Sequence, residues 1–238
     1  MVVAALTSML VRAGDVVGNW LRLKHYASLA ALQGAELVVF PEYCLTGFRE
    51  WWFGDALLYW ELLNSLRALA RRLGIYLVAG LLEPPHLVKG RADCAAFNSA
   101  VLIDPKGDVL LKHRKWEEPI LFCRGSEVRA VNTPLGRLAI IICGDLFSED
   151  VRERVRKLSV DYLIIPMDRS GTPSIDYNFA EEVEAMGEAV RECCVRRGAL
   201  IVNAHGHEGS YGFALILDAS GKPLKVLMGE GTLLSKLP

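Results

Sequence analysis

Three polar residues stand at the ends of mainly apolar, strand-like runs. Glu42 follows such a run directly after Pro41, while Lys115 and Cys143 each close one. Ligands of α/β sheets collect at the carboxyl ends of strands, so residues in these places can meet a substrate. A carboxylate, an ammonium and a thiol together supply a general base, a cation for a developing oxyanion and a nucleophile. The combination predicts covalent acyl-transfer chemistry.

Each of these residues also has a plainer interpretation when it is taken alone. Glu42 fits a surface turn, and Cys143 fits a buried structural thiol, because free cysteines are commonly small core residues. Lys115 ends a basic run that starts at Lys112, and such runs are most often solvated faces. The catalytic interpretation therefore depends on all three side chains meeting at one place.

Apolar residues at helical spacing predict four helices. We expect them over about Asp15–Leu32, Ala56–Leu73, Ser148–Leu158 and Tyr177–Arg197. Asp15 and Ser148 are capping residues that begin two of them, and glycines follow three of the four, as helix ends prefer. The last of these helices is expected to contain Cys193 and Cys194 and to be closed by Gly198.

Short runs rich in β-branched residues alternate with these helices and predict strands. Examples are Glu36–Phe40, Arg137–Cys143 and Asp161–Met167, and Pro105–Gly107 marks a hairpin turn. Alternating helices and buried strands predict an α/β protein. Because the two halves of the chain are similar, we expect a four-layer α-β-β-α sandwich of two mixed sheets flanked by helices, formed by residues 1–238 as a single domain.

The blocks around the three polar residues resemble those of the carbon–nitrogen hydrolase (nitrilase) superfamily. GAELVVFPEYCLTGF, from Gly34 to Phe48, is similar to the block that carries the general base. FNSAVLIDPKGDVLLKHRK is similar to the block that ends on the catalytic lysine, and TPLGRLAIIICGDLFSED to the block of the nucleophilic cysteine. The resemblance runs in family order over nearly the whole chain. It implies the roles of base, cation and nucleophile for Glu42, Lys115 and Cys143 in an amidase-like enzyme.

The same resemblance implies a second glutamate that orients the lysine. Counting back from the phenylalanine-x-x-glycine element at Phe122–Gly125 gives Glu118, with Glu117 and Glu127 as alternatives.

Four further residues are expected at the site. The resemblance implies that the backbone N–H of Gly144 faces the oxyanion, and that Tyr43, Trp116 and Phe147 line the pocket. Gly144 departs from the aromatic residue that is frequent at its position. This departure speaks against a true nitrile hydrolase, in which tryptophan usually follows the cysteine.

The expected reaction is hydrolysis of a small linear amide or carbamoyl compound through a thioester on Cys143, with release of ammonia or an amine. Two alternatives stay open: a glutaminase subunit that supplies ammonia to a partner, and a nitrilase-fold binding or scaffold protein without turnover. The substrate depends on segments near residues 48–55, 116–126 and 168–176, which the motifs do not fix. Family resemblance also implies a homodimer or higher homo-oligomer, assembled through the two helices of the second half.

Composition excludes several other classes of protein. The net charge is −1 with acids and bases interspersed, so there is no basic field to bind nucleic acid. The apolar runs are too short for a membrane span, and no basic leader precedes the first of them, which predicts a cytoplasmic protein. The six cysteines show no framework spacing and are expected as thiols. His205 and His207 have no partner acid, so we expect neither a metal nor another cofactor.

Overall fold

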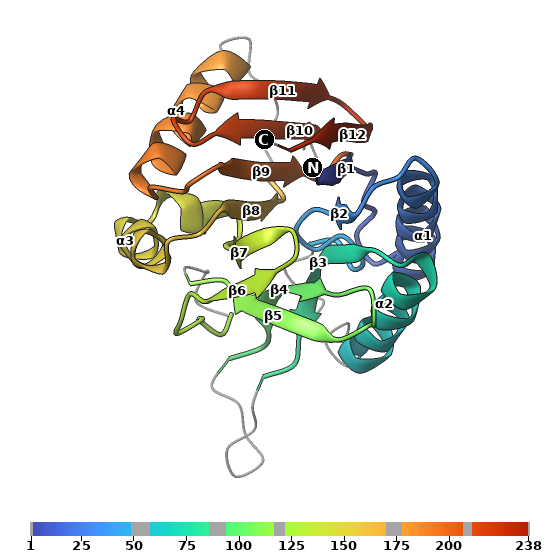
Figure 1. Ribbon diagram of the computed structural model, residues 1–238. Helices are drawn as coiled ribbons and strands as arrows, with labels where there is room; N and C mark the ends of the chain where they lie inside the picture. Colours follow the sequence, from blue (N-terminus) through green and yellow to red (C-terminus); the bar gives the residue numbers. More distant parts are fainter. Residues whose placement is uncertain are drawn as a thin grey trace.

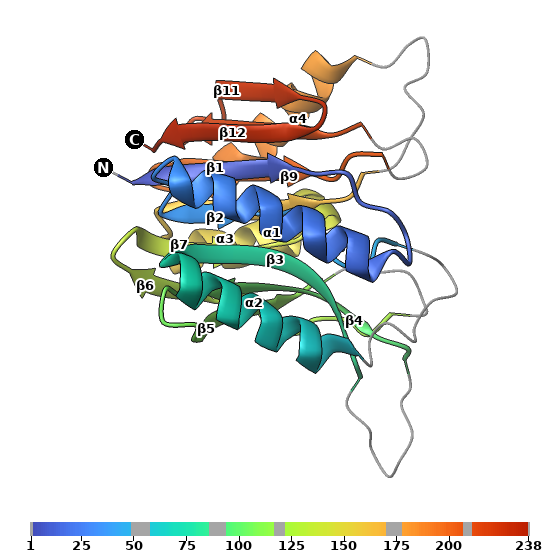
Figure 2. The ribbon, with the colours of Figure 1, turned by 90° about the vertical axis from the view of Figure 1, so that its right-hand side faces the viewer.

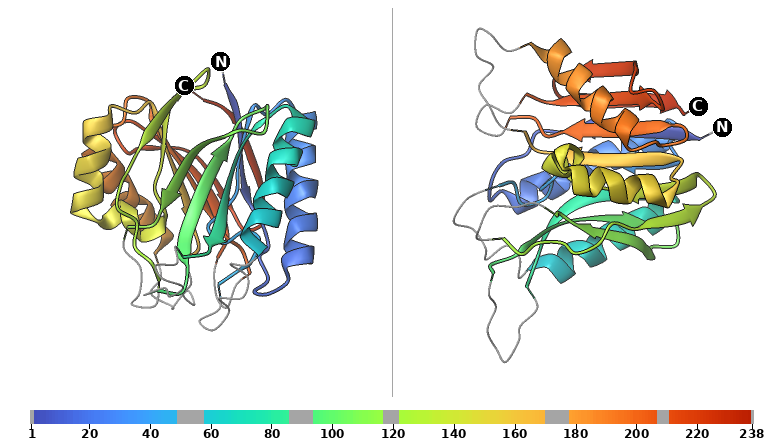
Figure 3. Two further views of the ribbon diagram at one scale, coloured as in Figure 1. Left: turned by 90° about the horizontal axis from the view of Figure 1, so that it is seen from below. Right: turned by 90° about the vertical axis from the view of Figure 1, so that its left-hand side faces the viewer.

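The computed structural model describes residues 2–48, 58–85, 94–116, 122–169, 178–206 and 211–237. Two six-stranded sheets pack face to face, and a pair of helices covers the outer side of each (Figure 3). The helices are α1 (Val16–Leu32), α2 (Tyr59–Leu73), α3 (Glu149–Leu158) and α4 (Phe179–Glu192), with a short 3-10 helix, η2 (Cys143–Phe147). The fold is therefore the four-layer α-β-β-α sandwich expected from the sequence.

The first sheet has the strand order β12-β1-β2-β3-β4-β5. Its strands are β1 (Val3–Ser8), β2 (Leu37–Val39), β3 (Tyr76–Glu83), β4 (Phe97–Ile103), β5 (Val109–Arg114) and β12 (Gly231–Lys236). The strands β1, β2 and β3 are parallel, and the remaining pairs are antiparallel. Strand β5 thus runs in the same direction as β2, so both end at the same edge of the sheet.

The second sheet repeats this plan with the order β11-β10-β9-β8-β7-β6. Its strands are β6 (Ala130–Thr133), β7 (Gly136–Ile140), β8 (Tyr162–Met167), β9 (Gly198–Asn203), β10 (Phe213–Asp218) and β11 (Pro223–Met228). The central strands β7, β8 and β9 are parallel. After β11 the chain crosses to the first sheet, where β12 pairs with β1, and the two ends of the chain lie side by side (Figure 1).

Alternation along the strands divides the core into three layers. In β2, Val38 packs toward the helices, whereas Leu37 and Val39 pack toward the other sheet. In β8, Leu163 and Ile164 divide in the same way. Because side chains alternate between the faces of a strand, a strand that is apolar throughout is buried on both sides.

The helices lie against the outer sides of the sheets (Figures 2 and 3). α1 buries Leu23 and Ala27, which lie one turn apart, and Asp15 caps its first turn by accepting a hydrogen bond from the Gly18 N–H at 2.9 Å. α4 buries Met186 and Val190 at the same spacing. Among the described residues, no helix combines the length and the apolar character needed to cross a membrane.

Two predicted boundaries are wrong. α4 ends at Glu192 and not at Arg197: Cys194 has a left-handed φ of 52°, and the Arg196 N–H bonds to the Val160 carbonyl at 2.9 Å, which takes the backbone out of the helix. The strand predicted to reach Cys143 ends at Ile140, because the chain turns there into η2.

The expectation that all six cysteines are thiols is also wrong. Cys94 and Cys123 form a disulfide, with their Cα atoms 5.1 Å apart. The Cys123 N–H bonds to the Ala96 carbonyl at 2.8 Å, and this backbone pairing brings two segments that are 29 residues apart into register. The other four cysteines are free.

Candidate active site

Glu42, Lys115 and Cys143 meet at the carboxyl ends of β2, β5 and β7. The Lys115 Nζ lies 3.0 Å from the Glu42 Oε1, and the Cys143 thiol hydrogen-bonds to the Glu42 carboxylate. The three residues come from segments up to 101 positions apart (143 − 42 = 101). Because β2 and β5 run in the same direction, their ends meet at one edge, and the end of β7 in the other sheet faces them.

The Glu42 carboxylate is held at both oxygens and is only 2% exposed. Its Oε1 accepts a hydrogen bond from the Asn98 Nδ2 at 2.6 Å as well as the one from Lys115. Its Oε2 accepts one from the backbone N–H of Asp168 at 2.8 Å. Donors that bond to the charged form stabilise a buried carboxylate. The sequence motifs did not identify Asn98 or Asp168 as part of this arrangement.

Gly80 in β3 allows the Glu42 backbone to approach the sheet. A Cβ at Gly80 would lie 2.6 Å from the Tyr43 backbone nitrogen and 2.8 Å from the Glu42 Cα. Tyr43 itself has a left-handed φ of 50°. An isolated glycine inside a strand pattern marks such a close approach, so the sequence carried a signal for this position.

Lys115 is fixed through its backbone. Its N–H bonds to the Asn98 carbonyl and its carbonyl accepts from the Gly125 N–H, both at 2.8 Å. A Cβ at Gly125 would lie 2.0 Å from the Arg114 carbonyl oxygen. The glycine of the Phe122–Gly125 element is therefore required by the packing that positions the lysine.

Cys143 is the first residue of η2 and has a left-handed φ of 46°. A non-glycine residue in this region carries strain that is common at active sites. Burial, then the charge of Glu42, raises the pKa of its thiol well above the ordinary value, while Lys115 and the Asp168 N–H act in the opposite direction. The thiol is thus neutral near neutral pH, and a nucleophilic role requires a base to take its proton.

Asp145 connects the lysine and cysteine segments. Its Oδ1 accepts from the Trp116 N–H at 2.9 Å, and its Oδ2 accepts from the Ile142 N–H at 3.0 Å. The His113 Nε2 lies 2.7 Å from the same Oδ2, and both side chains are buried. The Asp145 carboxylate therefore hydrogen-bonds both to Trp116, which follows Lys115, and to Ile142, which precedes Cys143.

Comparison with known proteins places this geometry in a family. The sequence matches the carbon-nitrogen hydrolase family over residues 3–207. The chain belongs to the carbon–nitrogen hydrolase family. It is therefore a hydrolase of the class that acts on non-peptide carbon–nitrogen bonds.

Individual relatives of this carbon–nitrogen hydrolase are distant. A deaminated glutathione amidase from Yersinia enterocolitica is 24% identical over 174 residues, which are 67% of this chain and 59% of that protein. The match thus spans less than two thirds of the relative's length.

Solved structures share the whole fold. The NitN amidase from Nesterenkonia sp. AN1 is 22% identical, with a TM-score of 0.85, over 100% of this chain and 93% of that one. A variant of the same amidase, with the acetamide moiety of fluoroacetamide covalently added at its active-site cysteine, is 21% identical, with a TM-score of 0.85, over 100% and 90%. Both of these structures are amidases that share the fold of this hydrolase.

The remaining site predictions have different outcomes. Glu117 and Glu118 lie outside the described residues, so the second glutamate stays a prediction. Glu127 is 59% exposed at its side chain and pairs with Arg129 at 2.9 Å. Gly144 is exposed, and within the described part of the chain a Cβ there would meet only the Lys115 Cε, at 4.0 Å.

The three aromatic residues predicted to line the pocket have different environments. Tyr43 is buried in an aromatic cluster with Phe48 and Phe122. The Trp116 ring lies under the Arg154 guanidinium at 4.4 Å, on the side of α3. Phe147 is 42% exposed, and its ring lies 5.4 Å from the guanidinium of Arg169, the residue that follows Asp168 in the sequence. Their roles toward a substrate stay predictions.

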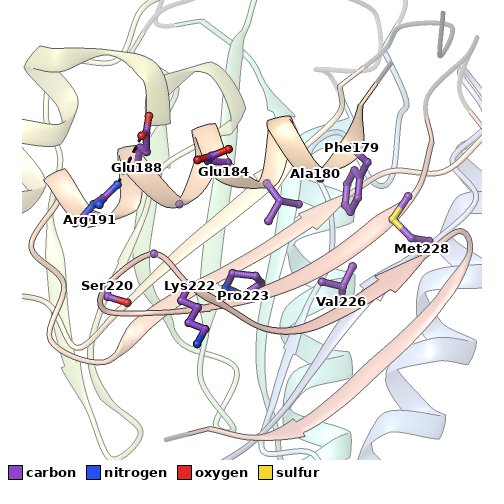
Figure 4. Close-up of a pocket in the computed structure, with 13 residues that line it drawn as sticks. Phe179, Ala180, Glu184, Glu188, Arg191, Ser220, Lys222, Pro223, Val226 and Met228 are labelled. Carbon is purple, nitrogen blue, oxygen red and sulfur yellow. Dashed lines mark ion pairs between the residues drawn. The ribbon is translucent and has the colours of Figure 1, made fainter. Parts of the chain in front are cut away.

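A hollow lies away from the catalytic set. It is a groove of about 650 Å³ between α4 and β11 (Figure 4). Its floor is apolar, with Phe179, Val226 and Met228, and its rim carries the Glu188–Arg191 pair. None of the residues that line this groove belongs to the catalytic set, so the groove is separate from the site at Cys143.

The described residues contain no group of three or more potential metal ligands. His205 lies in this part of the chain, and its Nδ1 accepts a hydrogen bond from the Gly212 N–H at 3.2 Å. His207 lies outside it.

Proposed function

We propose that this carbon–nitrogen hydrolase cleaves small linear amides or carbamoyl compounds by covalent catalysis at Cys143. The observation that supports the proposal most is the contact of one buried carboxylate, Glu42, with both the thiol and the Lys115 ammonium. A neutral thiol beside a fixed base and a fixed cation has the parts that nucleophilic acyl transfer needs.

The first half-reaction forms a thioester. Glu42 takes the thiol proton while the Cys143 sulfur attacks the carbonyl carbon, and the Lys115 ammonium and the Gly144 N–H face the oxyanion. Glu42 then gives the proton to the nitrogen, the carbon–nitrogen bond breaks, and ammonia or an amine leaves. Each oxyanion donor lowers the barrier by about 3–4 kcal/mol.

The second half-reaction releases the acid. Glu42 takes a proton from water, and the resulting hydroxide attacks the thioester carbon. The carbon–sulfur bond breaks, the proton returns to sulfur, and the carboxylic acid leaves. No redox change occurs, and the chemistry requires no group beyond the side chains and water. The predicted Glu118 would orient Lys115 and the attacking groups.

The test combines turnover with trapping. The purified protein is assayed for ammonia release on a panel of amides, carbamoyl compounds and nitriles, and fluoroacetamide is used to label the nucleophile. We expect ammonia from a short-chain amide and, by mass spectrometry, an added acetamide group on the peptide that contains Cys143. Cys143→Ala should lose both signals.

A matched control is Cys194→Ser, because Cys194 is a free, exposed cysteine outside the site. It should keep both turnover and labelling at Cys143. Turnover that survives Cys143→Ala would overturn the proposal, and the absence of both turnover and labelling would favour the scaffold alternative. Ammonia release restricted to glutamine would favour the glutaminase subunit.

We also propose that the protein forms a homodimer or higher homo-oligomer through the outer faces of α3 and α4. The apolar groove beside α4 and the half-exposed Val226 and Met228 on the edge strand β11 support this proposal. Analytical ultracentrifugation tests it, and a monomer at micromolar concentration would contradict it.

The compartment that we propose is the cytoplasm. Disulfides are uncommon in that compartment, so the Cys94–Cys123 bond does not support this part of the proposal.

A further inference from the structure

Asp168 is an acidic residue in the active site that the proposed mechanism does not use. It follows the end of β8 directly, and its backbone N–H bonds to the Glu42 Oε2 at 2.8 Å. The same N–H faces the Cys143 thiol. The carboxyl carbon therefore lies three bonds from a nitrogen that touches both the base and the nucleophile.

One oxygen of this carboxyl group has no partner. The Asp168 Oδ1 is fully buried and accepts no hydrogen bond from any residue in the described part of the chain. Arg169, the neighbouring cation, is engaged elsewhere: its guanidinium pairs with Glu182 at 2.7 Å. A buried acceptor without a donor costs about 1–3 kcal/mol, and such groups in folded proteins call for an explanation.

The charges around Asp168 point to the missing partner. In the described part of the site, Glu42 and Asp168 are two carboxyl groups, and Lys115 is the cation that faces them. Burial, together with the charge of Glu42, raises the pKa of Asp168 to about 7, while Lys115 opposes the rise. A second cation beside Asp168 would therefore favour the ionised form of this carboxyl group, which burial and Glu42 disfavour.

We propose that Asp168 is a specificity-determining residue that binds a protonated amino group of the substrate, so that the preferred substrates are short amides carrying an ammonium group. The inference rests on the proposed amide hydrolysis at Cys143. An ammonium supplies both things that the unpartnered oxygen lacks, a hydrogen-bond donor and a positive charge. A substrate with a carboxylate in the same place is disfavoured, because it would bring a like charge into a buried space.

The length of the substrate follows from the geometry. Because the Asp168 N–H faces the thiol and the carboxyl carbon lies three bonds from that nitrogen, the matching ammonium lies only a few bonds from the scissile carbonyl. Suitable probes are 3-aminopropanamide, which is cationic, its neutral analogue of equal length butanamide, and the anionic succinamate.

The experiment compares these probes in the full-length protein and in Asp168→Asn. This substitution keeps the backbone N–H that holds Glu42 and keeps the shape of the side chain, but it removes the charge. We expect kcat/KM to rank 3-aminopropanamide above butanamide, with succinamate last. In Asp168→Asn the ratio of the first two values should fall by about tenfold or more.

Glu184→Gln is the matched control, since it removes one exposed carboxylate from α4 and leaves the ratio unchanged. A purely structural role of Asp168 would lower kcat/KM for both amides in proportion, and an unchanged ratio in Asp168→Asn would overturn the inference.

A binding measurement separates this inference from the proposed function. In Cys143→Ala, calorimetry should show tighter binding of 3-aminopropanamide than of butanamide, and the additional change Asp168→Asn should remove the difference. Turnover of butanamide without any preference for the ammonium compound contradicts only the specificity role. Ammonium-dependent binding with no turnover by the unmodified protein contradicts only the proposed hydrolysis.

Discussion

The His113 imidazole and the Asp145 carboxylate lie 2.7 Å apart, from Nε2 to Oδ2, in a buried contact between the two sheets' strand ends. His113 belongs to β5, two residues before Lys115, and Asp145 lies two residues after Cys143. The contact therefore holds the cation and the nucleophile at a fixed separation. It makes Asp145 a positioning residue, because it acts through the backbone of its neighbours.

Replacing Asp145 with alanine should destabilise the protein. The change leaves the N–H groups of Ile142 and Trp116 and the His113 Nε2 without their acceptor in a buried place. Removing one partner of a buried charged contact costs about 3–5 kcal/mol. Urea denaturation measures the loss. Asp150→Ala, at an exposed position in the first turn of α3, is the control and should change stability by about 1 kcal/mol or less.

Replacing Lys115 with methionine should slow the reaction and leave binding almost unchanged. Methionine fills a similar volume but cannot face an oxyanion, so we expect kcat to fall by about 10²–10³-fold with little change in KM. Steady-state kinetics on the best amide of the panel measures both constants. A rise in KM alone would assign Lys115 to substrate binding.

Replacing Gly80 with alanine should displace the catalytic base. The new Cβ would meet backbone atoms of Glu42 and Tyr43, which cannot yield as a flexible side chain can. Overpacking of this kind costs about 1–3 kcal/mol, and the shift of Glu42 should lower kcat as well. Gly144→Ala is the matched control for stability, because its Cβ would enter open space and should cost less than about 1 kcal/mol. Equal stability of the two variants would contradict the packing argument.

Opening the Cys94–Cys123 disulfide should lower stability and leave the fold intact. The bond closes a segment that carries β4, β5 and Lys115, and its two cysteines are 29 positions apart. A cross-link over a loop of this length stabilises a protein by about 2–4 kcal/mol. Thermal unfolding of the double variant Cys94→Ser/Cys123→Ser measures the loss. Thiol titration under denaturing conditions should find four free thiols in the unmodified protein, and six would contradict the bond.

The raised pKa of Asp168 should appear in the pH dependence of stability. Its folded pKa of about 7 lies above the unfolded value of about 3.9, so between these values the folded protein keeps a proton that the unfolded chain has lost. Stability then falls as pH rises through this window, by up to about 1.4 kcal/mol per pH unit, and the penalty is constant above about pH 7.

The readout is a difference between two proteins, because other groups titrate in the same range. Among the described residues, the charged or titratable groups that face Asp168 are Glu42, Lys115 and Cys143, and all three are present in Asp168→Asn. The stability of Asp168→Asn relative to the unmodified protein should therefore rise between about pH 5 and pH 7 and then level off. A constant difference across this range would show that the Asp168 pKa is not raised.

Much of this protein was determined by local sequence pattern. Apolar spacing and capping residues predicted α1 and α3 to within one residue, because amphipathic periodicity reports which face of an element is buried. The alternation of helices and buried strands predicted the fold. The blocks that contain Glu42, Lys115 and Cys143 stand in family order and predicted the carbon–nitrogen hydrolase family. Glu42 was identified as an acid directly after a buried apolar run. The same rule applies to Asp168 after β8, but the family motifs do not include this residue.

Other features were decided only by contacts between distant segments. The early end of α4 follows from contacts such as the hydrogen bond from the Arg196 N–H to the Val160 carbonyl, which outweigh helix propensity. The same is true of the Cys94–Cys123 bond and of the Asp145 link, since neither has a spacing rule in sequence. The pKa of Asp168 depends on burial and on a carboxylate 126 positions away. Local pattern reports which face of an element is buried, but the partners of a buried polar group are fixed only when the two sheets close on each other.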